Sequence, residues 1–190
     1  MKRVAALLLV LLLLASAAAI ATIIHRGLSA RTQATKTEEM IARSMRRLAM
    51  PSATRRLPNP IVLTDAVLSE GRAHWADHCA SCHGNDGSGQ TEMGRNLYPR
   101  APDMRKPGTQ ELTDGELFSI IKNGVRLTGM PAWGDASGRD DADTWKLVHF
   151  IRHLPRITPA EIEQMKSMNP VSPEQMKERQ AEDEFLKGGR

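Results

Sequence analysis

The stretch that decides the fold reads His78-Cys79-Ala80-Ser81-Cys82-His83. Its two cysteines are the only ones in the chain of 190 residues. Two thiols three positions apart lie on one helical turn, where each can bond a vinyl group of the same porphyrin, and the next residue then presents its imidazole to the iron. The spacing therefore predicts covalent attachment of one haem at Cys79 and Cys82, with His83 as an axial ligand of the iron.

Three other kinds of site also use paired cysteines. A zinc site needs about four ligands, so it would have to recruit histidines from elsewhere in the chain. A thioredoxin-like redox pair expects a βαβ context, whereas the residues around this pair indicate helices and loops. A disulfide between Cys79 and Cys82 would close almost no loop and would stabilise little. Haem attachment is the interpretation that the flanking sequence favours.

Around this motif, roughly residues 65–156 resemble the class I cytochrome c family. Bacterial members commonly open with CxxCHGxxGxG, and the corresponding run here is Cys79-Ala80-Ser81-Cys82-His83-Gly84-Asn85-Asp86-Gly87-Ser88-Gly89. The resemblance implies an all-α fold, a small cytochrome c-like helical domain wrapped round one covalent haem c.

The resemblance also implies how two helices pack. The family has a glycine and an aromatic residue shortly before the first cysteine, here Gly71 and Trp75 in a helix over residues 68–76. In the family this glycine lets the N-terminal helix cross closely over the C-terminal helix, which would here be residues 143–154. Apolar residues of that second helix approximate a helical stripe: Trp145, Val148, Phe150, Ile151 and Leu154.

A second motif supplies the other axial ligand. The run 123–133 resembles the family's G-x-x-x-x-G-M-P-x-W/F loop, which implies that Met130 binds the iron opposite His83. A soft, neutral sulfur stabilises the reduced iron and suits an electron carrier. Met93 and Met104 are the fallback ligands, because each lies between the two motifs.

The ligand loop follows a predicted helix over residues 112–123, capped by Thr113 or Asp114. Four apolar residues of this helix are expected to pack on the haem: Leu117, Phe118, Ile120 and Ile121. The loop before the helix resembles the family's segment leading to a proline whose carbonyl accepts the proton of the histidine Nδ1. Pro99 and Pro102 are both candidates, and the sequence leaves the choice open.

An uncharged run, Val4 to Ile24, follows Lys2 and Arg3. As a helix rising about 1.5 Å per residue, it is long enough to cross a hydrocarbon core of about 30 Å. The alternative is a signal peptide cleaved near residues 15–17, but the apolar run continues beyond that site and favours an uncleaved anchor.

The predicted domain order follows from these segments. It comprises a transmembrane anchor or signal peptide over residues 1–24, a basic stalk over 25–63, the cytochrome c domain over 64–157 and a polar, partly helical or disordered tail over 158–190.

The basicity of the chain lies in the stalk. Residues 25–63 hold eight Arg and Lys against Glu38 and Glu39, and no aromatic residue lies among them for nucleic-acid bases to stack on. This composition disfavours nucleic-acid binding and fits a membrane surface. Residues 38–50 predict a short amphipathic helix that lies on the membrane, against a partner or in solvent. Its apolar positions are Met40, Ile41, Met45, Leu48 and Ala49.

The tail is polar and carries two helix-start signatures, Thr158-Pro159-Ala160-Glu161 and Ser172-Pro173-Glu174-Gln175. They predict two short surface helices or a partly disordered segment. A docking helix for a partner enzyme, with Ile162, Met165 and Met168 on one face, stays open.

These features together predict a function. Because c-type haem is attached outside the bacterial cytoplasm, the domain is expected on the periplasmic side of the bacterial cytoplasmic membrane. An iron held by His83 and Met130 has no open position for a small-molecule substrate. The chain is therefore predicted to be an electron carrier and not an enzyme, with periplasmic or membrane redox proteins as partners. A haem c subunit of a membrane-associated oxidoreductase complex and a haem-based gas or redox sensor are the alternatives.

Overall fold

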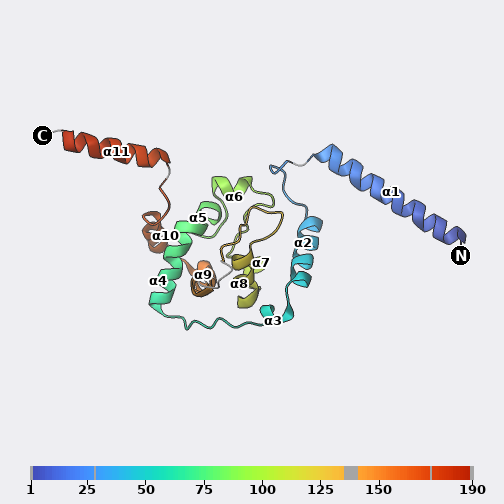
Figure 1. Cartoon of the computed structure of the whole chain (residues 1–190), viewed down its shortest axis with the longest axis horizontal. Coiled ribbons are helices and arrows are strands. Elements are labelled where there is room, and N and C mark those ends of the chain that lie inside the picture. Colours follow the sequence, from blue (N-terminus) through green and yellow to red (C-terminus); the bar gives the residue numbers. More distant parts are fainter. Residues whose placement is uncertain (1, 28, 135–140, 172, 189–190) are drawn as a thin grey trace. The chain divides into compact units, whose positions relative to one another are not determined.

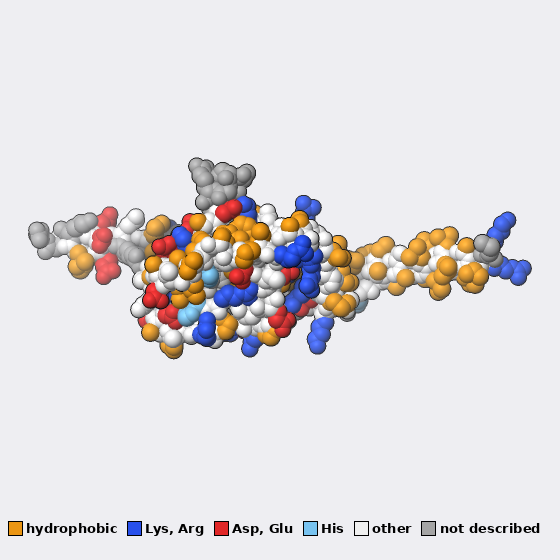
Figure 2. All heavy atoms as spheres, turned by 90° about the horizontal axis from the view of Figure 1, so that it is seen from below, with side chains coloured by type: hydrophobic (Ala, Val, Ile, Leu, Met, Phe, Trp, Pro, Cys, Tyr) orange, Lys and Arg blue, Asp and Glu red, His pale blue; other side chains and the backbone are white. Residues whose placement is uncertain are grey.

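The computed structural model describes residues 2–27, 29–134, 141–171 and 173–188. The chain divides into two compact units, Met1–Thr32 and Gln33–Arg190. The first unit contains α1 (Lys2–Arg26), whose apolar side chains are exposed along the whole helix (Figure 2). Its length and hydropathy are those of a membrane-crossing helix.

Every regular element described in the second unit is helical, which confirms the predicted all-α fold (Figure 1). The segment η1 is a single π-helical turn and η2 is a short 3₁₀ turn. In chain order the elements are α2 (Lys36–Ala49), α3 (Ser52–Arg55), α4 (Asp65–His74), η1 (Trp75–Cys79), α5 (Ala80–His83), α6 (Glu92–Asn96), α7 (Pro107–Gln110), α8 (Asp114–Asn123), α9 (Asp141–His153), η2 (Leu154–Arg156), α10 (Pro159–Lys166) and α11 (Pro173–Gly188).

The core forms where α4 crosses α9. Gly71 of α4 is buried at the crossing, and a Cβ atom there would lie 2.5 Å from the carbonyl oxygen of Lys146. Glycine is therefore required for the two backbones to approach this closely, as the sequence predicted. The whole predicted stripe is buried: Trp145, Val148, Phe150, Ile151 and Leu154.

Helix α8 begins with a capping box. The Thr113 hydroxyl accepts from the Glu116 N–H at 3.1 Å, and the Glu116 carboxylate accepts from the Thr113 N–H at 2.8 Å, so Thr113 is the N-cap. The expectation that Phe118 packs on the haem is wrong. Its ring stacks on Trp145 with the ring centroids 4.1 Å apart, because this side of α8 faces α9.

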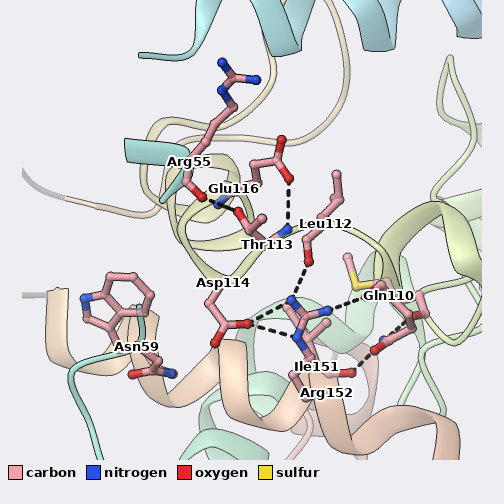
Figure 3. A network of polar contacts seen from close by, with 11 residues as sticks. Arg55, Asn59, Gln110, Leu112, Thr113, Asp114, Glu116, Ile151 and Arg152 are labelled. Atoms are coloured by element: carbon pink, nitrogen blue, oxygen red, sulfur yellow. Dashed lines mark hydrogen bonds and ion pairs between the residues drawn. The ribbon is translucent and has the colours of Figure 1, made fainter. Parts of the chain in front are cut away.

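A polar network holds α9 against the start of α8 (Figure 3). Arg152 of α9 donates from Nη1 to the Gln110 carbonyl at 2.7 Å and from Nη2 to the Leu112 carbonyl. Its guanidinium also pairs with Asp114 at 2.8 Å. In return, Gln110 Nε2 donates to the Ile151 carbonyl at 2.9 Å. These bonds satisfy the backbone carbonyls of Gln110 and Leu112, which precede α8. They therefore hold the start of α8 against α9.

Helix α10 belongs to the folded core. Thr158 and Glu161 form the capping box that the sequence predicted. Met165 is completely buried against the core, and Asn169 donates to the Ala76 carbonyl at 2.8 Å. The sequence allowed this face of the helix to dock on a partner enzyme. In the structure, Met165 of this face packs instead into the core of its own domain.

Helix α11 has 16 residues, so the second tail helix is longer than the short helix predicted. Its predicted N-cap, Ser172, lies outside the described residues. Phe185 and Leu186 are exposed on α11, and the rest of its described surface is polar or charged apart from Met176 and Ala181.

Candidate haem site

A cavity of about 560 Å³ lies within the second unit. This volume falls in the range of about 300–1,000 Å³ that is typical of ligand and cofactor sites. The four predicted haem residues all line it: Cys79, Cys82, His83 and Met130. The cysteines and the histidine come from η1 and α5, whereas the methionine comes from the loop after α8. The fold thus brings together two motifs that are far apart in the sequence.

The attachment motif is held from its N-terminal side by Trp75. This side chain is buried, and its ring lies beside the His83 imidazole with the ring centroids 5.7 Å apart. Trp75 Nε1 donates to the Gly84 carbonyl at 3.0 Å. Gly84 ends α5 at φ 76°, a backbone conformation that favours glycine. The tryptophan noted before the first cysteine therefore positions the histidine that follows the second.

His83 is buried, with 7% of its surface exposed, and burial lowers its pKa to about 4. The Pro102 backbone acts in the opposite direction and raises this pKa in part. The imidazole is therefore neutral at pH 7, which is the form that binds a metal ion. Its Nδ1 is buried without a hydrogen-bond partner among the described residues. Pro99 and Pro102 both line the cavity, and the choice between their carbonyls as acceptor for the Nδ1 proton stays open.

Cys79 and Cys82 are not joined by a disulfide. Burial, with a smaller contribution from Cys82, raises the pKa of Cys79 to about 12, and burial also raises the pKa of Cys82. Both groups are therefore thiols and not thiolates at pH 7. Within the described ranges, no three His, Cys, Asp or Glu side chains gather as a zinc site would require. Two thiols and a neutral imidazole on a largely apolar cavity fit a covalently attached haem.

The loop after α8 turns back on the helix and carries Met130 to the cavity. The Val125 N–H donates to the Met130 carbonyl at 3.0 Å, and the Met130 N–H donates to Thr128 Oγ1 at 3.1 Å. The Trp133 N–H donates to the Ile121 carbonyl of α8 at 3.1 Å. These bonds fix the backbone on both sides of Met130.

The two fallback methionines differ in position. Met104 also lines the cavity, where it is half-buried against the core. Met93 is 54% exposed and outside the lining, and its Sδ lies 3.3 Å from Cys82 Sγ. Met130 therefore remains the predicted ligand, with Met104 as the other methionine that the cavity admits.

Sequence reasoning missed one wall of this cavity. Four residues of α2 contribute to it: Glu39, Ala42, Arg43 and Arg46. Their spacing places them on one side of a helix, and this pattern was the signal in the sequence that could have predicted the wall. The apolar positions of the same helix drew attention to its other side.

Comparison with known proteins shows what the domain is similar to. Residues 66–151 match the family model described as cytochrome C oxidase, cbb3-type, subunit III. This matched range contains both motifs of the cavity. The domain is a class I c-type cytochrome.

The cytochrome domain binds haem c covalently and works in electron transfer. Over 88 residues the chain is 33% identical to the cbb3-type cytochrome c oxidase subunit FixP of Rhizobium meliloti (strain 1021). The alignment covers 46% of this chain and 28% of that subunit, so the chain spans under a third of its relative's length. Helix α2 lies outside the range that the family model matches.

Proposed function

We propose that this membrane-anchored cytochrome faces the periplasm and carries single electrons on one haem c between redox partners. The observation that carries the proposal is the shared cavity, to which both motifs contribute. Cys79 and Cys82 would hold the haem through thioether bonds. His83 and Met130 would each provide a ligand to its iron.

When bound, the haem supplies a reversible one-electron couple. The residues of the chain provide the ligands and the apolar surroundings of the haem. His83 stays neutral because burial disfavours its protonated form, and its imidazole is therefore free to bind the metal. Leu117 and Ile121 of α8 add apolar surface to the cavity and exclude water from it. A water-poor site with a thioether ligand favours the reduced iron.

The direction of α1 follows from the chemistry of attachment. Because c-type haem is attached outside the bacterial cytoplasm, the N-terminus would lie inside and the second unit outside. A reporter enzyme fused after residue 190 tests this topology: periplasmic activity is expected, and cytoplasmic activity would overturn it.

The comparisons favour a second candidate, a haem subunit of a membrane oxidoreductase complex. Both the family description and the relative concern subunits of an oxidase. Purification of the full chain in mild detergent separates the two candidates. Stable co-purification with a catalytic chain supports the subunit, whereas isolation of the cytochrome alone supports the free carrier.

The visible spectrum tests the axial ligands. We expect the purified full chain to show a low-spin c-type spectrum that dithionite reduces and carbon monoxide leaves unchanged. Met130→Ala should then bind carbon monoxide readily, while Met93→Ala, the matched control, should not. Carbon monoxide binding by the native protein would contradict the carrier and favour the sensor alternative.

A further inference from the structure

Helix α2 turns its charged side toward the cavity. Arg43 and Arg46 line the cavity together with Glu39 and Ala42. The apolar side chains of the helix are at least half exposed: Met40, Ile41, Met45 and Leu48. An amphipathic helix beside a core ordinarily buries its apolar side, because this removes apolar surface from water. Helix α2 has the opposite orientation. We take this as a sign that the cavity holds a group that attracts the arginines.

The arginines of α2 have few close carboxylate partners among the described residues of the chain. Arg43 is 3.8 Å from Glu39, and Arg47 is 3.8 Å from Glu116, both at the long end of the range for an ion pair. Within the described part of the chain, Arg46 makes no ion pair shorter than 4 Å. Burial and Arg43 lower its pKa, and Glu116 only partly offsets them. Partial burial of Arg46 beside a second cation, Arg43, has a cost that an anion in the cavity would remove.

Two further cations lie on the cavity wall, and the one further carboxylate in the described lining is already paired. Arg100 and Lys106 are these cations, and the carboxylate of Asp103 is held by Arg105 at 2.8 Å. Gly108 leaves room for one of the arginines, since a Cβ atom there would lie 2.9 Å from Arg43 Nη1. The cavity is thus apolar beside α5 and α8 and positively charged beside α2.

Haem has the complementary distribution of groups. Its vinyl groups, which the two cysteines would bond, lie toward one edge of the porphyrin, and its two propionates lie toward the opposite edge. Figure 1 shows α5 and α2 apart from each other, with loops of the chain between them in this view. A porphyrin bonded at Cys79 and Cys82 would therefore direct its carboxylates toward α2.

We propose that Arg43 and Arg46 bind the haem propionates, so that α2 forms one wall of the haem site. Guanidinium groups suit this role because their planar N–H groups pair with both oxygens of a carboxylate. The inference rests on haem attachment at Cys79 and Cys82. It makes a segment outside the matched range 66–151 part of the haem site.

Resonance Raman spectra of the full-length holoprotein test the contact through the propionate bending bands. Arg43→Gln and Arg46→Gln should each shift these bands, and the double variant should shift them most. Arg47→Gln is the matched control, because Arg47 belongs to the same helix but does not line the cavity. Unchanged bands in the double variant would overturn the proposal.

The reduction midpoint potential gives a second readout. Removing positive charge near the iron should favour the oxidised state, so the double variant should have a lower potential than the native protein. We expect a change of up to about tenfold in the redox equilibrium, which is about 59 mV for a one-electron couple. Arg47→Gln should change it less. Equal shifts in the double variant and the control would indicate a general charge effect and contradict the specific contact.

If the glutamine variants fail to acquire haem, the Arg43→Lys, Arg46→Lys variant provides the test. Lysine keeps the charge but lacks the paired N–H groups, so the bands should shift while the potential stays near the native value. Unchanged bands in this variant would also count against the proposal. A low-spin c-type spectrum in every variant would leave the haem assignment intact, so the two proposals fail separately.

Discussion

Helices α9 and α2 are both amphipathic, but they face the domain in opposite ways. Helix α9 buries Phe150 and Val148 completely and keeps its charged residues toward the surface. Helix α2 exposes Leu48 to 86% and places Arg43 and Arg46 on the cavity wall. The difference shows that periodicity identifies two sides of a helix, whereas the chemistry of the opposing surface decides which side faces inward.

The largest effect is expected when the cofactor is lost. In a Cys79→Ala, Cys82→Ala variant the chain should bind no covalent haem, and residues 63–156 should be largely unfolded, because the group that fills the space between α2 and α8 is missing. A poorly dispersed NMR spectrum is the expected result. A well-dispersed spectrum would show that α9 and its partners fold without haem.

The inward side of α9 is tested next by Phe150→Ala. The Phe150 ring is fully buried, and its centroid lies 5.6 Å from that of Trp75. The free energy of unfolding should fall by about 3–5 kcal/mol, as for other buried aromatic truncations. Urea unfolding of the detergent-solubilised holoprotein measures it. Leu127→Ala, at a side chain that is 92% exposed, should cost less than about 0.5 kcal/mol.

A smaller loss is expected from Gly71→Ala. The new methyl group would meet the Lys146 carbonyl in α9, a backbone atom that cannot rotate away. Overpacking of this kind costs about 1–3 kcal/mol. The same urea experiment measures the loss, with Ser69→Ala, an exposed position on α4, as control. Equal stability of the two variants would show that α4 and α9 do not cross this closely.

The smallest effect should come from the outward side of α2. Ile41→Gln and Leu48→Gln change exposed side chains, so the free energy of unfolding in detergent should stay within about 0.5 kcal/mol of the native value. Thermal unfolding followed by haem absorbance measures it. A loss above about 1 kcal/mol would mean that α2 buries its apolar side, and the contrast with α9 would disappear.

Elements with strong local signals were predicted well. The buried stripe of α9, the Thr113 cap of α8 and the crossing at Gly71 all matched. Each depends on a cap, a period or a small residue within one segment. Phe118 was placed wrongly, because two sides of α8 are apolar and only the position of α9 distinguishes them. Met165 was misjudged for a similar reason, since a polar tail gives little indication of the surface that one apolar residue meets.

The sequence by itself determined the attachment motif, the methionine loop and the apolar anchor, because each is a contiguous pattern whose chemistry follows from residue type and spacing. Only the tertiary structure decided that α10 packs into the core and that α2 lines the cavity with arginines. These features depend on which surfaces meet across the fold. That depends on long-range packing and desolvation, which the local pattern of residues does not encode.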